Sequence, residues 1–142
     1  MKELTIEAAV ENIEVVTDFI SAELENMDCP IKAQTQICIA IDELFGNIAR
    51  YAYSPDVGKA TVRFDVEQEP LSVIITFIDN GKPFNPLELA EPDIHASASE
   101  RREGGLGIFL VKKTMSMVEY AYRDGKNILT IKKTLTQKGK SK

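Results

Sequence analysis

Apolar and polar positions along the first third of the chain predict one strand and two helices. Residues 2–8 alternate apolar and polar side chains, which is typical of a half-buried strand. Apolar residues then recur at helical spacing over residues 13–27, and Asn12 is the expected N-cap of this helix. Pro30 suits the first turn of a second helix, which we expect to end near Tyr53.

The same patterns predict two hairpins in the rest of the chain. Residues 59–67 alternate, residues 71–78 are rich in β-branched side chains, and the residues between them favour a turn. Residues 118–122 and 127–135 form a second pair of strands, and Asp124-Gly125 between them is a strong hairpin signal. Four strands are therefore expected in addition to the first one.

Residues 85–103, between the two hairpins, show no periodicity, and Gly104-Gly105-Leu106-Gly107 then opens an apolar helix over residues 108–117. Loops of this length are often functional, so we expect a lid that is mobile without its ligand and ordered with it. The element order predicts an α+β two-layer sandwich, with helices on one face of a mostly antiparallel sheet. We expect a single domain over residues 1–142, with residues 137–142 as a frayed tail.

The second predicted helix is apolar on nearly every side, which indicates a buried helix. Its apolar residues are Ile37, Ile39, Ile41, Leu44, Phe45 and Ile48. Glu43, Asn47 and Arg50 nevertheless form one polar stripe along it. Buried polar groups need partners, so the stripe favours a polar cavity where a carboxylate activates a hydroxyl and an amide oxygen holds a metal. The alternative is the narrow solvent-exposed face of an amphipathic helix.

Asp79 follows the predicted strand 71–78 and is itself followed by Asn80-Gly81. A carboxylate at a strand end can accept a hydrogen bond from an exocyclic amine, and glycine lets the backbone pass close to a flat ring. An ordinary turn explains the same three residues.

The glycine run Gly104-Gly105-Leu106-Gly107 stands at an expected helix N-terminus. Free backbone N–H groups and the helix dipole favour phosphate there. A flexible hinge is the alternative, because the spacing fits neither the P-loop nor the dinucleotide-binding fingerprint.

Composition narrows the class of protein. Two cysteines and one histidine are too few for a disulfide framework or a zinc cluster. No apolar run is long enough to cross a membrane and the N-terminus has no signal-peptide pattern, so we expect a cytoplasmic protein with no membrane partner. Residues 1–100 carry a charge balance of −13 and residues 101–142 one of +8. The acidic first part argues against direct nucleic-acid binding.

The order of these motifs resembles the GHKL ATPase superfamily. Its N box is matched by Glu43-Leu44-Phe45-Gly46-Asn47, its G1 box by Asp79-Asn80-Gly81-Lys82-Pro83-Phe84, and its G2 box by Gly104-Gly105-Leu106-Gly107-Ile108-Phe109-Leu110. Within the superfamily, Pro83-Phe84-Asn85-Pro86 and Tyr51-Ala52-Tyr53 are most similar to the anti-sigma factor serine kinases. The chain departs from that group at Tyr51, where many members have histidine, and at Met115-Ser116-Met117-Val118.

This resemblance implies ATP and Mg²⁺ as ligands and assigns roles within the motifs. Glu43 would be the general base, Asn47 the Mg²⁺ ligand, Asp79 the acid that reads the adenine amine, and Gly81 the glycine beneath the base. Gly105 and Gly107 would surround the phosphates. The further nucleotide-binding residues would be Arg50, Pro83, Phe84, Gly104, Leu106, Ile108 and Thr130.

The resemblance also implies a function: a serine kinase that phosphorylates an anti-anti-sigma factor, sequesters a sigma factor and forms a homodimer. The alternative is a non-catalytic, ATP-dependent protein-binding module. A histidine kinase catalytic domain is a third possibility, but we expect it to need a phosphoacceptor helix pair for which these 142 residues leave no room.

Overall fold

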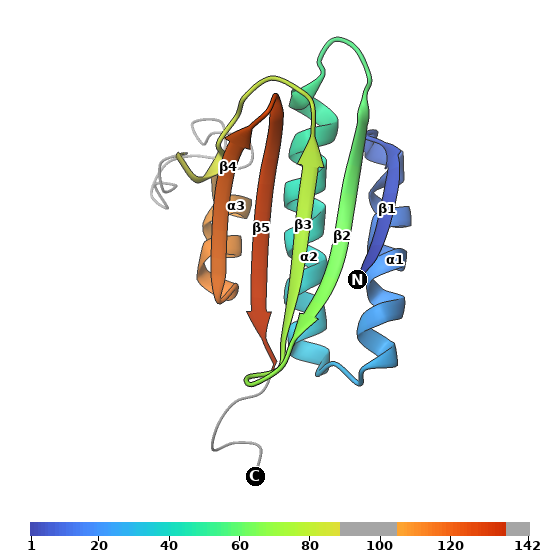
Figure 1. Cartoon of the computed structure of the whole chain (residues 1–142), viewed down its shortest axis with the longest axis vertical. Helices are drawn as coiled ribbons and strands as arrows, with labels where there is room; N and C mark the ends of the chain where they lie inside the picture. The colour runs from blue at the N-terminus through green and yellow to red at the C-terminus, as the bar shows by residue number, and fades with distance from the viewer. Residues whose placement is uncertain (89–104, 136–142) are drawn as a thin grey trace.

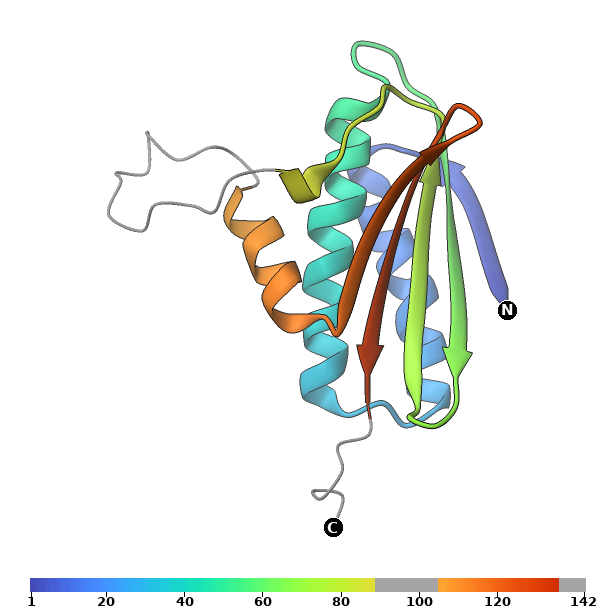
Figure 2. The same ribbon diagram turned by 60° about the vertical axis from the view of Figure 1, so that its left-hand side comes forward.

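A computed structural model describes residues 1–88 and 105–135, which fold into two layers (Figures 1 and 2). One layer is a five-stranded sheet in the order β1-β2-β3-β5-β4, and every strand pair in it is antiparallel. The strands are β1 Lys2–Glu7, β2 Lys59–Glu67, β3 Ser72–Asp79, β4 Met117–Arg123 and β5 Lys126–Thr134. The helices α1 Ile13–Asn26, α2 Ile31–Asn47 and α3 Gly105–Thr114 cover one face of the sheet. The predicted α+β two-layer fold is confirmed.

Burial along the strands explains why the chain forms this sheet. In β2, the buried side chains alternate with more exposed ones, so one face of the strand contacts the helices. At the β4–β5 turn, Asp124 and Gly125 have φ of 55° and 76°, the backbone conformation that a two-residue hairpin requires. The β3–β5 ladder runs from the Asp79–Asn127 pair at one end to the Ser72–Thr134 pair at the other.

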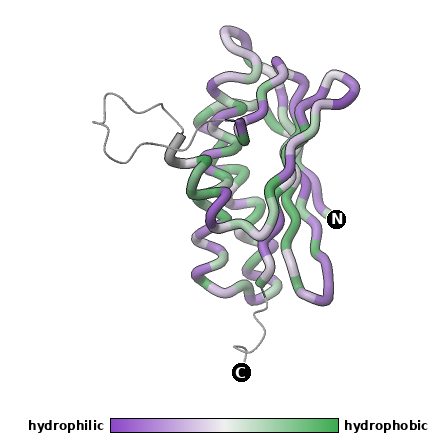
Figure 3. The backbone as a smooth tube through the Cα atoms, turned by 90° about the vertical axis from the view of Figure 1, so that its left-hand side faces the viewer, coloured by the Kyte–Doolittle hydropathy of each residue, from purple (hydrophilic) through white to green (hydrophobic). Residues whose placement is uncertain are grey.

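The hydrophobic core lies between the sheet and the helices. In Figure 3 the hydrophobic residues follow the helices and the middle of the strands, and the loops at the strand ends are hydrophilic. The largest fully buried side chains are Phe45, Phe77, Ile20, Leu24, Ile37, Ile41, Leu44, Ile75, Ile108, Ile131, Val16 and Val62.

The helices differ from their predicted form in three places. Asn12 precedes α1 but does not cap it, because its Nδ2 donates to the Glu7 carbonyl oxygen at 2.9 Å. Ile39 is 48% exposed, so the first half of α2 has a solvent-exposed face and only its C-terminal half is enclosed. The helix α3 ends at Thr114, because the Ser116 N–H already donates to the Lys132 carbonyl oxygen of β5.

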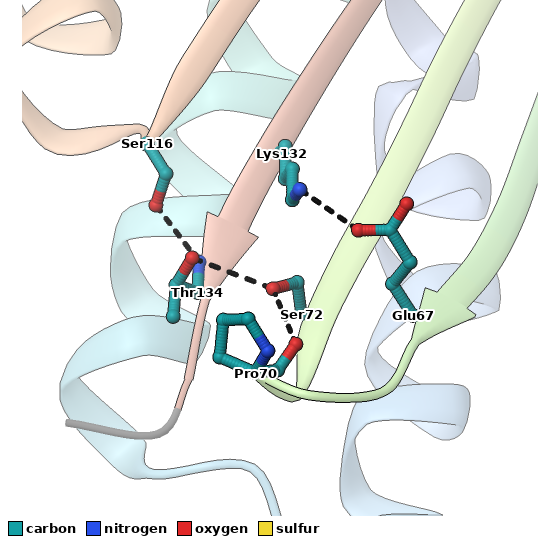
Figure 4. A network of polar contacts seen from close by, with 6 residues as sticks. All are labelled: Glu67, Pro70, Ser72, Ser116, Lys132 and Thr134. Atoms are coloured by element: carbon teal, nitrogen blue, oxygen red, sulfur yellow. Dashed lines mark hydrogen bonds and ion pairs between the residues drawn. The ribbon is translucent and has the colours of Figure 1, made fainter. Parts of the chain in front are cut away.

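A polar network joins three strands at the end of the sheet near the β2–β3 turn (Figure 4). The buried Ser72 hydroxyl donates to the Pro70 carbonyl oxygen at 3.0 Å and lies 3.4 Å from Thr134 Oγ1. The Thr134 N–H donates to Ser116 Oγ at 2.9 Å, and Lys132 forms an ion pair with Glu67 at 2.8 Å. This network stabilises the end of the β3–β5 ladder opposite Asp79.

Part of the predicted lid can be described. Pro86–Glu88 forms a short 3₁₀ turn, whereas residues 89–104 lie outside the described residues, and with them most of the predicted lid and Gly104. The predicted tail, residues 137–142, lies outside them as well. Within the described part of the chain, no helix has the length and apolar character to cross a membrane.

Candidate functional site

A cavity lies among residues from the end of β3, the β4–β5 hairpin and the C-terminal end of α2. These segments are at the same end of the molecule (Figure 1). The volume of the cavity is about 400 Å³, including the open space at its mouth. The lining is mostly apolar with a few polar groups, which is typical of small-molecule sites. It comprises Leu44, Asn47, Ile48, Ala52, Phe77, Asp79, Lys82, Phe84, Pro86, Tyr120, Asn127 and Leu129. The structure thus brings three predicted site residues, Asn47, Asp79 and Phe84, to one cavity.

Asp79 is the buried charged group of this cavity, with only 4% of its surface exposed. Its Oδ1 accepts hydrogen bonds from the Gly81 N–H at 2.8 Å and from Asn127 Nδ2 at 2.9 Å. Burial raises the pKa of this carboxyl above its ordinary value, and the hydrogen bonds from Asn127 and Gly81 offset part of the rise. Asp79 therefore stands at the end of a core strand with one oxygen anchored.

The prediction from sequence missed Asn127, which is buried beside Asp79. Its Nδ2 donates to Asp79 Oδ1 and to the Lys82 carbonyl oxygen at 2.8 Å. Its Oδ1 accepts from the Phe84 N–H at 3.1 Å and from the Tyr120 hydroxyl. The signal was present in the strand pattern, because antiparallel pairing of residues 71–78 with 127–135 sets Asp79 opposite Asn127.

Thr130, an expected nucleotide-binding residue, does not reach the cavity. Asn127, Leu129 and Ile131 are buried on the helix-covered face of β5, so strand alternation turns Thr130 to the other face. The expectation for Thr130 is therefore wrong, and Asn127 is the polar residue that this strand contributes.

The loop after β3 is held against the end of α2, which continues into a π-helical turn, Ile48–Ala52. The Lys82 N–H donates to the Ala52 carbonyl oxygen at 2.9 Å, and the Asn80 N–H donates to the Tyr53 hydroxyl at 2.8 Å. A Cβ on Gly81 would overlap Ala52, so the close approach that requires glycine here is one between two parts of the backbone.

Two aromatic rings lie next to each other, and one of them, Phe84, lines the cavity. The centroids of Tyr51 and Phe84 are 6.4 Å apart with the rings tilted by 51°, and both side chains are partly exposed. Tyr51 and the exposed Pro83 are not part of the lining. Phe84 gives the lining an apolar surface on which a flat ligand could stack.

The predicted polar stripe of α2 divides into two parts. The Glu43 carboxylate lies in the space that a Cβ on Gly107 would occupy, so the absence of a side chain at Gly107 lets the first turn of α3 approach it. Asn47 is 6% exposed and lines the cavity. Arg50 is exposed and its guanidinium lies over Gly46 on the helix surface, so it lies outside the cavity.

The remaining predicted residues belong to the glycine run and to α3. Gly105 begins α3, and Ile108 is a fully enclosed core residue rather than a lining residue of the cavity. The side chain of Leu106 lies outside the described part of the structure. A carboxylate from α2 and the first turn of α3 are nevertheless neighbours, an arrangement that combines a proton acceptor with the positive end of a helix dipole.

The residues present fit a Mg²⁺ ion that is held mainly by the phosphate oxygens of a bound molecule. Asn47 Nδ2 is buried and has no hydrogen-bond partner among the described residues. A half-turn of this amide would offer the oxygen instead, because the two orientations have the same shape. Mg²⁺ usually keeps several waters and takes one or two protein ligands together with phosphate oxygens. The described residues contain no cluster of three or more acidic, histidine or cysteine side chains that could hold a metal, so Asn47 would act with such a ligand.

Comparisons with known proteins identify relatives of the whole domain. "Serine-protein kinase RsbW" of Bacillus mycoides (strain KBAB4) is 27% identical over 134 residues, which cover 92% of this chain and 82% of that protein. "Serine/threonine-protein kinase BtrW" of Bordetella bronchiseptica is 28% identical over 95 residues, covering 67% of this chain and 66% of that one.

A solved structure, Acinetobacter baumannii histidine kinase AdeS, matches 96% of this chain and 70% of its own at 16% identity and a TM-score of 0.49. The histidine kinase domain of the Erythrobacter litoralis EL346 blue-light activated histidine kinase matches at 15% identity and a TM-score of 0.49, with 75% of this chain and 46% of that chain covered. The family model described as "Histidine kinase-like ATPase domain" matches residues 6–133. The chain therefore belongs to the family of histidine kinase-like ATPase domains.

Proposed function

We propose that this protein is an ATP-dependent protein serine kinase that regulates transcription by phosphorylating an anti-anti-sigma factor and by sequestering a sigma factor. The observation that carries the proposal is the buried Asp79 carboxylate in a mostly apolar cavity, with Asn47 in the same cavity and Glu43 beside the first turn of α3. The family and the names of the relatives above support the choice of a kinase.

Asp79 would give the cavity its preference for adenine. Both hydrogen bonds described for its carboxylate go to Oδ1, so Oδ2 is the oxygen that faces a ligand amine. Guanine presents a carbonyl oxygen at the corresponding position, and two acceptors facing each other in a buried site repel. The apolar side chains of Ile48, Phe77 and Leu129 would exclude water from this contact.

Glu43 would serve the transfer step. Its carboxylate would accept the proton of the serine hydroxyl as that oxygen attacks phosphorus, and the proton would remain on Glu43 until solvent takes it. The γ-phosphoryl group of ATP would be transferred as its bond to the β–γ bridging oxygen breaks and ADP leaves, and Mg²⁺ would supply positive charge to the phosphate oxygens. Asn47 would hold the ion through its amide oxygen, and the first turn of α3 would offer backbone N–H groups to the phosphates.

The partners are proposed from the resemblance of the sequence motifs to the anti-sigma factor serine kinases and not from the cavity. A small anti-anti-sigma protein would provide the serine. Once that serine is phosphorylated, a sigma factor would bind to the kinase. We also propose that the protein acts in the cytoplasm, as a homodimer. The second candidate is a non-catalytic module, in which ATP sets the shape of a sigma-binding surface without turnover. It differs from the kinase in that Glu43 would have no role.

The deciding experiment is to incubate the purified protein with γ-labelled ATP, Mg²⁺ and each anti-anti-sigma protein of its host. Label on a serine of one of them, absent when Glu43→Gln replaces the wild type, is the expected result. ATP binding without transfer to any candidate would select the non-catalytic module. No measurable ATP binding at all would reject both functions.

A further inference from the structure

The side-chain amide of Asn127 is fully engaged by the protein itself. It donates to Asp79 Oδ1 at 2.9 Å and to the Lys82 carbonyl oxygen at 2.8 Å, with the Gly81 carbonyl oxygen at 3.5 Å. It accepts from the Phe84 N–H at 3.1 Å and from the Tyr120 hydroxyl. An asparagine side chain has two donor hydrogens and two acceptor lone pairs on its oxygen, and here each has a partner.

A fully engaged amide cannot form a further hydrogen bond to a ligand, although Asn127 lines the cavity. Its influence on a ligand must therefore pass through the groups that it holds. We propose that Asn127 is the positioning residue of the nucleotide site: it fixes the plane of the Asp79 carboxylate so that one oxygen faces the adenine amine, and the Phe84 N–H and the Tyr120 hydroxyl hold the Asn127 amide in place. This inference rests on the proposed binding of ATP and specifies how the chain sets its nucleotide specificity.

The torsion that turns a carboxylate about its own axis is soft, so burial alone does not fix the plane of the Asp79 carboxylate or the direction of the oxygen that faces the cavity. The Asn127 amide fixes both only if the amide itself cannot turn over. The Phe84 N–H prevents that, because it can only donate and would face the NH₂ group after a half-turn. The Lys82 carbonyl oxygen, which can only accept, imposes the same orientation, and the Tyr120 hydroxyl, which can donate or accept, adds a contact to Oδ1.

The same ladder provides a matched control for a merely structural role. Its two ends each carry a polar pair, the buried pair Asp79–Asn127 at the cavity and the pair of buried Ser72 and half-buried Thr134 at the far end. The two pairs are seven residues apart along each strand, about 23 Å at the usual rise of a strand. Ser72→Ala should thus weaken the sheet without changing the cavity.

Asn127→Asp is the informative variant because it keeps the shape of the side chain and makes its donor depend on pH. Two adjacent carboxylates cannot both ionise easily, so one proton is retained at acidic pH and lost at alkaline pH. With that proton, the side chain at position 127 can still donate to Asp79; without it, the two carboxylates repel. The wild type has the opposite pH trend, because Asp79 loses its acceptor charge as the pH falls.

The other groups that face Asp79 do not produce this reversal. Tyr53 and Tyr120 stay neutral over this range because burial raises the pKa of each. The Lys82 ammonium donates to the Ser54 carbonyl oxygen at 3.1 Å. The charge of Glu88 raises the pKa of Tyr120 further, so that it helps to keep this hydroxyl neutral. From α2 and the π-helical turn after it, the cavity is lined by Leu44, Asn47, Ile48 and Ala52, which carry no titratable group.

The experiment measures the dissociation constants of ATP and GTP by calorimetry at about pH 8 and about pH 5.5, a range that spans the expected titration of the carboxylate pair. We expect Asn127→Asp to bind ATP at least about tenfold more weakly than the wild type at the higher pH and to recover most of that loss at the lower pH. Tyr120→Phe should weaken ATP binding about threefold to tenfold and reduce the preference for ATP over GTP. Ser72→Ala should lower the melting temperature and leave both constants unchanged.

Wild-type affinity of Asn127→Asp at both pH values would overturn the positioning role. So would a loss without recovery at the lower pH, or an equal loss in Ser72→Ala. If Asn127→Asp does not fold, Tyr120→Phe decides, since it removes one hydroxyl and unchanged ATP affinity would then overturn the role. A wild type that binds no ATP would reject the proposed function itself, a result distinct from all of these.

Discussion

Asp79 is the residue at which stability and function oppose each other. Burial raises the pKa of its carboxyl above the value of an unfolded chain, so the folded protein binds this proton more tightly. The free energy of unfolding contributed by Asp79 is therefore fully present at pH values below the unfolded pKa. It falls as the pH rises through the window between the unfolded and the folded pKa.

Asp79→Asn removes this charge and keeps the acceptor oxygen for Gly81 and Asn127. We expect its free energy of unfolding near neutral pH to equal or exceed that of the wild type, and the difference to shrink as the pH is lowered toward 4, about the ordinary pKa of aspartate. ATP affinity should fall about a hundredfold, because an NH₂ group would face the adenine amine. Urea unfolding at several pH values and calorimetry measure the two effects, and an Asp79→Asn protein with wild-type ATP affinity would contradict the role of Asp79.

Glu43 and Asn47 lie one helical turn apart and should have separable roles. Glu43→Gln keeps the shape of the side chain and removes the proton acceptor, so phosphoryl transfer should fall at least about a hundredfold while the dissociation constant of ATP changes little. Asn47→Ala should instead weaken Mg²⁺-dependent ATP binding. Transfer assays and calorimetry on both variants separate the two effects; wild-type transfer by Glu43→Gln would remove Glu43 from the chemistry.

At the scale of single residues, the sequence predicted the site unevenly. Asp79 was predictable because its place after a strand and before Asn80-Gly81 depends on local sequence alone. Asn127 was not chosen, because its importance arises from strand pairing between residues that are 48 positions apart. Ile39 was expected to be buried, but helical periodicity cannot tell which side of an apolar helix the rest of the chain leaves uncovered.

At the scale of elements, α2 and α3 lie close together at a glycine, Gly107, whose lack of a side chain leaves room for Glu43. A Cβ on Gly107 would overlap the Glu43 carboxylate. Within a helix, replacing glycine by alanine ordinarily stabilises the protein by about 1 kcal/mol. At Gly107 that gain is opposed by the need to move Glu43, which can turn its carboxylate away.

Gly107→Ala should thus leave the free energy of unfolding within about 1 kcal/mol of the wild type and lower phosphoryl transfer at least about tenfold. Gly46→Ala in α2 is the matched comparison for stability, because the three atoms nearest to its Cβ would all belong to the guanidinium of Arg50, the far end of a flexible side chain. It should stabilise the protein by up to about 1 kcal/mol. Denaturant unfolding and a transfer assay report both quantities, and full activity of Gly107→Ala would show that the position of Glu43 is unimportant.

Most elements could be predicted from periodicity, since each strand and helix buries one face against a single core. The boundaries that were predicted wrongly depend on hydrogen bonds to residues outside the helix. α3 ends early because the Ser116 N–H donates to Lys132 of β5, and Asn12 does not cap α1 because its side chain donates to the Glu7 carbonyl oxygen.

At the scale of the molecule, β1 is one of the two edge strands of the sheet, the other being β4, and it pairs only with β2 among the described residues. A second copy could extend the sheet there by pairing its own β1. We expect light scattering at micromolar concentration to give the mass of a dimer, and dilution to lower it. A monomeric mass with and without ATP would contradict the proposed homodimer.

The anchoring of Asn80-Gly81 also bears on the chemical ageing of the protein. Deamidation begins when the backbone nitrogen of the following residue attacks the asparagine side chain, and glycine leaves that attack unhindered. In the folded protein the Gly81 nitrogen is engaged by Asp79, and the Asn80 nitrogen by Tyr53. The contacts that shape the cavity should therefore slow the conversion of Asn80 to aspartate and isoaspartate, and preparations that unfold in storage should show this change first.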